Sequence, residues 1–238
     1  MLQELLLFLV GIVIGVMNAI AGGGMLLGFP VLLATGTPAL VANVTSNIII
    51  LPGLITSAYG YRKYLRRIPK AYLLLAAPCT VGAGIGAVIL RNTPSSNFEQ
   101  LVPGLIVFAV VLFAFQPFLH QHVHRHMNGP AKHRKRIQPV LLLAVAMFPL
   151  SIYGGYFGAG FGFIMLAFLG FTKMHEIHQM NALKNLMSIC IVVTSIICLF
   201  SAHLIDWRQG LVMGSGNLIG GYVGAMGAQK FSSHAIRI

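Results

Sequence analysis

Two long stretches without a charged residue constrain this chain more than any other feature of its sequence. No Asp, Glu, Lys or Arg occurs in residues 5–61, a run of 57 positions, or in residues 137–172, a run of 36. A helix needs about 20 apolar residues to cross the roughly 30 Å of hydrocarbon in a bilayer. In the whole chain 57% of residues are hydrophobic and only 8% are charged, whereas soluble domains carry about 25% charged residues. The sequence therefore predicts an all-α, polytopic integral membrane protein and excludes a soluble enzyme or a secreted domain.

The positive charge is gathered in two short polar segments. Ten of the 16 Lys and Arg residues lie in residues 62–70 and 125–136. Basic residues concentrated in short loops between apolar segments are typical of cytoplasmic loops. The net charge of +12 therefore indicates membrane orientation rather than nucleic-acid binding. We expect residues 62–70 and the basic, His-rich loop 120–138 to be cytoplasmic, with the segment around residues 92–99 outside.

Glycine, proline and charged residues divide the apolar sequence into segments of helical length. The expected segments are 5–20, 25–34, 39–60, 71–90, 101–119, 139–153, 163–171, 177–202 and 209–228. Glycine-rich breaks interrupt the sequence at Gly22–Gly24 and at Gly154–Gly162. Each break separates a longer apolar segment from a shorter one.

The first part of the sequence aligns with the second part, without gaps, at one constant shift in residue number. We call this shift, which pairs Gly22 with Gly160, the repeat offset. The identical pairs fall on Gly, Asn, Thr and Ser rather than on the abundant Leu and Ile, and they include Gly22 with Gly160, Gly24 with Gly162, Asn43 with Asn181, Asn47 with Asn185, Ser57 with Ser195, Gly82 with Gly220 and Gly86 with Gly224. We interpret this pattern as an internal duplication. Residues 1–119 form the first transmembrane repeat, residues 120–138 the loop, and residues 139–238 the second repeat.

Repeated halves that each open with a glycine-interrupted apolar segment indicate the binding site of a transporter. Backbone that leaves the helix inside a membrane needs protein or a water-filled cavity around it, and the second half-helix then points its positive N-terminus into the membrane interior. The broken segments either cross the membrane or are re-entrant. The re-entrant alternative places 13 basic residues inside and two outside, whereas the crossing alternative gives 11 and four. The re-entrant count follows the positive-inside rule better, inverts the two halves and places the C-terminus inside. For Gly82, Gly86, Gly220 and Gly224 we favour close helix packing instead.

One lysine lies deep within a predicted membrane segment. Lys184 shares a helix face with Asn181 and Asn185 at i, i+3 and i+4 spacing, and intramembrane charges usually mark a substrate pathway. The alternative is a lysine that extends its side chain to the membrane interface. No Asp or Glu accompanies it, so the pattern favours an anion over a cation. The candidate substrate-binding residues are Gly22, Gly23, Gly24, Asn43, Asn47, Gly160, Gly162, Asn181, Lys184 and Asn185.

The loop contains four alternating histidines, His120, His122, His124 and His126. Closely spaced histidines can bind metal, but the loop offers no Cys or acidic ligand, and we expect a solvated cytoplasmic loop. We therefore predict no metal site. Nucleophile–base pairs, phosphate loops and other catalytic patterns are absent from the sequence, so we predict neither an enzyme nor a cofactor.

The glycine-rich segments resemble a known family. Gly15 to Gly24, followed by Pro30, is similar to the opening motif of the sulfite exporter TauE/SafE family, and Gly154 to Gly162, Asn181 to Asn185 and Gly220 to Ala225 resemble its second-half counterparts. The resemblance implies a bacterial inner-membrane permease that exports small inorganic or organosulfur anions of the sulfite and sulfonate class.

One segment departs from the family pattern. The segment 101–119 would pair with residues 239–257, but the sequence ends at Ile238. The last helix of the second repeat is therefore expected to be missing, and a homodimer or a partner subunit would cover the face it leaves. Two alternative functions remain at this point. They are a non-transporting truncated paralogue or membrane assembly factor, and a metal-handling membrane protein that uses the histidine loop.

Overall fold

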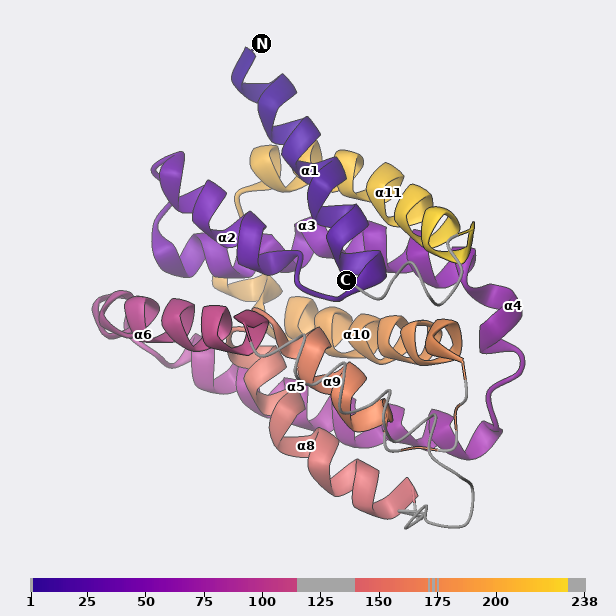
Figure 1. The fold of residues 1–238 in the computed structure, drawn as a ribbon. Coiled ribbons are helices and arrows are strands. Elements are labelled where there is room, and N and C mark those ends of the chain that lie inside the picture. Colours follow the sequence, from indigo (N-terminus) through magenta and orange to yellow (C-terminus); the bar gives the residue numbers. More distant parts are fainter. Residues whose placement is uncertain (1, 115–139, 171, 173, 175, 231–238) are drawn as a thin grey trace.

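The computed structural model describes residues 2–114 and 140–230, except residues 171, 173 and 175, and within these ranges every regular element is a helix (Figure 1). The main helices are α1 (Leu2–Ile20), α2 (Met25–Ala34), α3 (Ala39–Gly60), α5 (Ala76–Arg91), α6 (Ser95–Ala114), α8 (Val140–Tyr156), α9 (Phe161–Gly170), α10 (Ile177–Leu199) and α11 (Trp207–Lys230). Short helices complete the set: α4 (Arg62–Leu65), η1 (Lys70–Leu75) and η3 (Phe200–Ala202). The predicted all-α fold is confirmed. The predicted loop 120–138 lies outside the described residues.

Four helical segments of the described chain are long and apolar enough to span a membrane. They are Leu2–Ile20, Ala39–Gly60, Lys70–Arg91 and Ile177–Ala202. The outer surface also exposes large apolar side chains, among them Val145 at 62%, Ile197 at 70% and Leu211 at 63%. Such a surface would be unfavourable in water and is suited to contact with lipid. The protein is a multi-pass membrane protein.

Contacts between the two halves show which helices run in parallel. Gly216 of α11 lies against Phe8 of α1, and Gly224 of α11 lies against Val16. Because both numbers rise together, α1 and α11 are parallel. The same comparison makes α3 parallel to α11, since Gly210 lies against Ile48 and Gly60 against Ala225.

The remaining long helices of the core run in the opposite direction. Gly82 of α5 lies against Phe148 of α8, and Gly86 lies against Ile152, so α5 and α8 are parallel. Asn185 of α10 contacts Ser57 of α3, whereas Asp206, after α10, contacts Thr45. Helices α10 and α3 are therefore antiparallel. Tyr61, directly after α3, and Leu75, directly before α5, belong to one buried cluster, so α5 begins where α3 ends and runs back. The helices that the repeat offset pairs therefore run in opposite directions: α3 and α10, α1 and α8, and α5 and α11.

The two glycine-broken segments each return to the end of the molecule from which they started. Glu4 of α1 forms an ion pair with Arg208 in the first turn of α11, at 2.7 Å. Thr35, directly after α2, donates a hydrogen bond to Gln209 of the same turn at 3.0 Å. The start of α1 and the end of α2 therefore lie together, and Figure 1 shows α2 turning back from the middle of the molecule.

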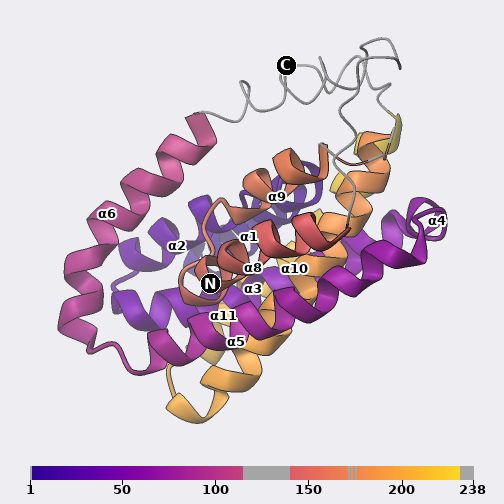
Figure 2. The same cartoon turned by 90° about the horizontal axis from the view of Figure 1, so that it is seen from below.

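The second broken segment opens toward the other end. Helix α8 packs against η1, where α5 begins. Met174, after α9, belongs to the same buried apolar cluster as Tyr61 and Ile68. We call this end, which carries Arg62, Lys63, Arg66, Arg67, Lys70 and Lys230 among the described residues, the basic end. The opposite end carries Arg91 and Arg208. Figure 2 shows α4 at the basic end and the turn from α5 to α6 at the other.

Glycines allow the two parallel pairs of helices to pack closely. A Cβ atom at Gly220 would meet the carbonyl oxygen of Ile12, and one at Gly86 would meet that of Ile152. Gly82 and Gly224 face neighbouring backbone in the same way, at 2.7 and 2.8 Å. The predicted packing role of these four glycines is confirmed, and it joins α1 to α11 and α8 to α5, so that the first helix of each half packs against a helix of the other half.

The element bounds follow the repeat offset, which pairs Gly22 with Gly160. Adding this offset to the bounds of α3 gives 177–198, beside α10 at Ile177–Leu199, and adding it to Lys70–Arg91 gives 208–229, beside α11 at Trp207–Lys230. This agreement supports the division into repeats 1–119 and 139–238, which stays a proposal.

Candidate functional site

The two glycine breaks meet inside the molecule. Helix α1 ends at Ile20 and α2 begins at Met25, while α8 ends at Tyr156 and α9 begins at Phe161, so both predicted helix breaks are present. A Cβ atom at Gly22 would lie 2.9 Å from the Cα of Gly162, and one at Gly162 would lie 2.7 Å from the carbonyl oxygen of Gly22. Gly22 and its counterpart Gly160 both have positive φ, +92° and +78°, a conformation that glycine adopts without strain.

Lys184 lies directly beside this contact. Its Cδ is 3.3 Å from the Cβ position of Gly22, and its side chain is fully buried, with 0% exposed. Its ammonium donates to the carbonyl oxygen of Asn18 at 2.9 Å and to Oδ1 of Asn181 at 3.0 Å. An ammonium has three donor hydrogens, so one donor has no acceptor among the described residues.

No acidic side chain balances Lys184 within the described part of the chain. The four acids of the sequence, Glu4, Glu99, Glu176 and Asp206, all lie at or near helix ends. Burying a charge without a counter-charge is costly. An anion at this position would supply the missing negative charge, so this position favours anions over cations.

The breaks also present unpaired backbone donors. Helix α2 has no side-chain cap at its N-terminus, and within the described residues the N–H groups of Gly23, Gly24 and Met25 donate no hydrogen bond. At the second break the same holds for Ala159 and Gly160. Free N–H groups at a helix N-terminus, together with the helix dipole, favour anions.

The predicted asparagines divide between the two breaks. Asn181 supports Lys184 at the first break, while Asn43 donates to the carbonyl oxygen of Tyr156, at the start of the second break, at 2.9 Å. Asn185 donates to Ser57 at 2.6 Å, and Asn47 is buried one turn after Asn43. The structure thus brings Gly22, Gly162, Asn181 and Lys184 into one place. The binding role of all ten predicted residues stays a prediction.

Sequence reasoning missed a polar cluster between Lys184 and the basic end. Tyr61, after α3, stacks on His178 of α10 with ring centroids 6.1 Å apart, and Tyr64 lies 5.0 Å from the same ring. The hydroxyl of Tyr61 and Nδ1 of His178 are buried and have no hydrogen-bond partner among the described residues. A tyrosine and a histidine at the ends of membrane segments resemble ordinary interfacial residues, so no local pattern indicated this pairing.

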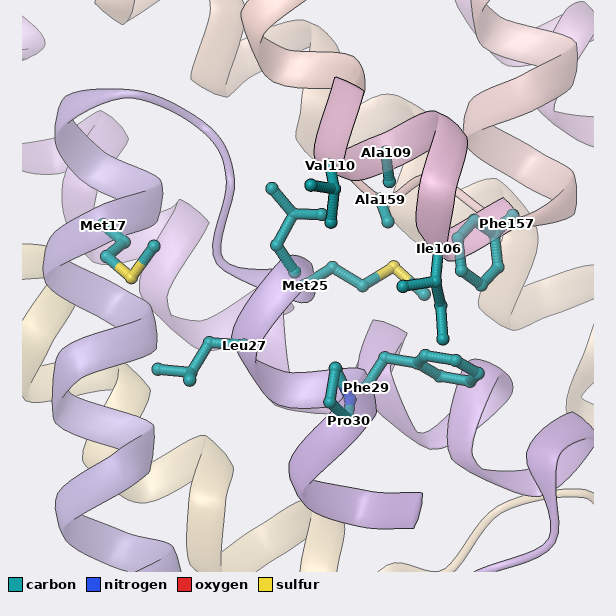
Figure 3. A pocket seen from close by; sticks show the side chains of 11 residues that line it. Met17, Met25, Leu27, Phe29, Pro30, Ile106, Ala109, Val110, Phe157 and Ala159 are labelled. Carbon is teal, nitrogen blue, oxygen red and sulfur yellow. The ribbon is translucent and has the colours of Figure 1, made fainter. Parts of the chain in front are cut away.

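A cavity of about 260 Å³ lies beside both breaks (Figure 3). Its walls come from α1, α2, α6 and the turn between α8 and α9, and its lining is almost wholly apolar. None of the ten predicted site residues lines it, but Met25 and Ala159, their neighbours in the sequence, do.

The metal alternative rested on residues 120–126, which lie outside the described residues. In the part of the chain that the structure describes, no group of three or more His, Cys, Asp or Glu side chains is placed to hold a metal ion.

Comparison with known proteins agrees with the membrane architecture. A family model described as "Sulfite exporter TauE/SafE" matches residues 7–238. A "probable membrane transporter protein" of Haemophilus influenzae is 30% identical over 229 residues, covering 92% of this chain and 83% of the relative. A "probable membrane transporter protein ORF9" of a Sinorhizobium species is 26% identical over 97% of this chain and 85% of the relative. The Escherichia coli "probable membrane transporter protein YfcA" is 24% identical over 92% and 78%. No solved structure matches the chain.

Proposed function

The chain belongs to the sulfite exporter TauE/SafE family of membrane transporters, and from this premise we propose that it exports small anions of the sulfite and sulfonate class. The proposed site lies where the two glycine breaks meet, with Lys184 as its charged group. The proposed location is the inner membrane of a bacterium.

The observation that carries this proposal is the buried Lys184 beside two half-helix N-termini. One of its ammonium hydrogens is free within the described chain, and unpaired backbone N–H groups flank it at both breaks. An oxyanion such as sulfite offers several acceptor oxygens on one centre. Charge-assisted hydrogen bonds of this kind are about twice as strong as neutral ones, and they would compensate for the loss of water around the anion.

Neutral amide groups hold Lys184 in place without neutralising its charge. Asn181 accepts one hydrogen of the ammonium through Oδ1, and Asn185, the next residue on α10, donates to Ser57. A transported ion must bind well enough to enter and weakly enough to leave. A site with one positive charge and no competing carboxylate meets both requirements for a small anion.

The charge distribution supports an orientation with the basic end in the cytoplasm. Of the nine Lys and Arg residues in the described ranges, six lie at the basic end, two lie at the opposite end, and Lys184 is buried between them. The positive-inside rule assigns the richer end to the cytoplasm. Both broken segments are then re-entrant, one from each side, and the basic residues concentrate anions at the cytoplasmic mouth.

Energetics favour export. The membrane potential of a bacterium is negative inside, and moving one elementary charge through 100 mV is worth about 2.3 kcal/mol. That corresponds to roughly a 50-fold concentration ratio. An anion with one negative charge is therefore driven outward without a coupled ion. With no described Asp or Glu near Lys184, the usual carboxylate relay for protons is also missing.

The test is anion flux in liposomes that contain the purified protein. We expect labelled sulfite to move toward the positive side of a potassium-diffusion potential in the absence of a pH gradient. Lys184→Met in the same liposomes should reduce this flux to the level of empty liposomes. Flux that ignores the potential and follows an imposed pH gradient would contradict electrogenic export, and absence of flux for every sulfur oxyanion would contradict the proposed substrate class.

A further inference from the structure

The cavity beside the breaks is apolar although it adjoins a polar site. Met17 of α1, Phe29 of α2, Ala109 of α6 and Phe157 before the second break all contribute to its lining. Figure 3 shows Met25 pointing from α2 across the cavity toward Ile106 of α6. A small inorganic anion makes no use of such a lining, since it carries no apolar surface to bury.

The cavity is continuous with the backbone of both breaks. Met25 is the first residue of α2, and Ala159 lies in the turn before α9. Both residues are nearly fully buried, and the N–H group of neither donates a hydrogen bond within the described chain. The same two residues therefore present unpaired backbone donors and an apolar wall. A ligand that satisfies both has an end that accepts hydrogen bonds, for which helix N-termini favour an anionic group, and an apolar end.

We propose that the cavity between α1, α2 and α6 is a subsite for the hydrocarbon tail of the transported anion, so that the preferred substrates are alkyl-substituted anions rather than bare sulfite. This inference rests on the proposed function, because it takes the anionic head to lie at the glycine breaks beside Lys184. The tail then extends past Met25 toward α6.

The size of the cavity sets the length of the tail. A cavity of about 150 Å³ holds a benzene molecule, so about 260 Å³ accommodates roughly six to ten carbon atoms on the same scale. Two lining residues, Pro30 and Val110, are exposed on the outer surface. The cavity therefore reaches the lipid-facing side between α2 and α6, and the end of a longer tail would meet lipid rather than protein.

The binding of a homologous series tests this subsite. The probes are sulfite and the linear alkanesulfonates from methanesulfonate to hexanesulfonate, titrated into the full chain in nanodiscs and into nanodiscs without protein. Each buried methylene should lower the dissociation constant roughly fourfold. Alkylammonium ions with the same tails control for partition into lipid, and they should show no saturable binding.

Two variants of α6 show whether the gain comes from this cavity. Ala109, which is fully buried, is replaced by Phe to fill the cavity. We expect the dependence on chain length to disappear, while the affinity for methanesulfonate changes less than twofold. Ile106→Ala enlarges the cavity and should raise the affinity for hexanesulfonate relative to butanesulfonate. Val107→Phe places the same ring on the exposed face of the helix, where Val107 is 62% exposed, and should leave the series unchanged.

The outcomes separate this inference from the proposed function. If sulfite and methanesulfonate bind but longer tails add nothing, the tail subsite is wrong, a lipid acyl chain becomes the better occupant, and the anion site stands. The same conclusion follows if Ala109→Phe leaves the chain-length dependence intact. If no anion binds at all, the proposed function and the tail subsite are both wrong.

Discussion

Each half of the chain donates a side-chain hydrogen bond to a carbonyl oxygen beside the helix break of the other half, at matched accepting positions, but only one half does so with a charge. In the second half, Lys184 donates to the carbonyl oxygen of Asn18, near the end of α1. In the first half, Asn43 donates to the carbonyl oxygen of Tyr156, the last residue of α8. The repeat offset pairs Asn18 with Tyr156 and Lys184 with Ser46, which bonds within its own helix. Polar side chains contact the backbone at both breaks, whereas a charged one does so at only one of them among the described residues, and the proposed anion site is placed at that break.

The two ends of the α3–α10 pair also differ, because one carries polar side chains where the other carries apolar ones. Toward the basic end, Tyr61 and His178 face each other with unpaired polar atoms. The residues at the matched positions toward the opposite end are Leu199 and Leu40, both buried in the apolar core. At these matched positions, buried unpaired polar atoms therefore lie between Lys184 and the basic end, and apolar side chains lie toward the opposite end.

The largest effect expected concerns the inverted orientation of the halves, because labelling is all-or-none. In a variant whose three cysteines are replaced by alanine, a single exposed cysteine is introduced at Ser95, the first residue of α6, at Ser201, between α10 and α11, or at Lys63. With inverted halves, a membrane-impermeant maleimide should label Ser95→Cys and Ser201→Cys in intact cells, and Lys63→Cys only after permeabilisation. Labelling of Ser95→Cys but not of Ser201→Cys in intact cells contradicts the inverted arrangement.

Replacing matched glycines in the α1–α11 and α5–α8 pairs should lower the free energy of unfolding by different amounts. A Cβ atom at Gly220 would overlap the carbonyl oxygen of Ile12, whereas at Gly82 the nearest backbone oxygen is 2.7 Å away. We expect Gly220→Ala to lower the free energy of unfolding by about 3 kcal/mol and Gly82→Ala by about 1–2 kcal/mol, as overpacking does in general. Thermal unfolding in detergent measures both.

The control for these two glycines is Gly227, where a Cβ atom meets nothing within 4 Å. Gly227→Ala should be neutral or slightly stabilising, since alanine favours helix by up to about 1 kcal/mol. Equal destabilisation by all three changes would show that the loss does not depend on the close helix contacts.

The difference in charge between the halves should appear in anion binding. Lys184→Met should weaken the binding of sulfite by about 30- to 150-fold, equivalent to about 2–3 kcal/mol for a charge-assisted hydrogen bond. Ser46→Ala, at the matched position, should change it less than threefold because Ser46 bonds to the carbonyl oxygen of Ala42 in its own helix. Titration of both variants, with size-exclusion profiles to show that they are folded, decides whether the charge is part of the site. Comparable losses of sulfite affinity in both variants would show that the charge of Lys184 has no special part in binding.

The smallest effect concerns two matched serines. Ser57 accepts the hydrogen bond of Asn185 across the α3–α10 contact, at 2.6 Å, while Ser195 donates to Ile191 within α10 at 2.9 Å. Ser57→Ala leaves a buried amide donor unpaired and should cost about 1–2 kcal/mol of stability. Ser195→Ala should cost less than about 0.5 kcal/mol, because its carbonyl partner keeps the helical hydrogen bond. A reversed order in unfolding temperature would show that the interhelical bond is not formed.

The helices and their breaks could be predicted closely from the sequence. The predicted segments 25–34 and 39–60 coincide with α2 and α3, and the breaks fall where the glycines are. Apolar runs of membrane length and glycine interruptions are local signals, so they can be read without knowledge of distant residues. Lys184 and Asn181 could be selected for the same reason, since a charge and an amide one turn apart stand out in an apolar helix.

Local patterns of residues therefore account for the helical membrane class, the position of both breaks and the polar residues of α3 and α10. Other features exist only in the folded molecule: Gly22 meets Gly162, Lys184 donates to Asn18, and an apolar cavity forms beside Met25 and Ala159. These contacts join segments that lie far apart in the sequence. Their formation depends on α1 packing against α11 and α8 against α5, and no local pattern specifies which helix packs against which.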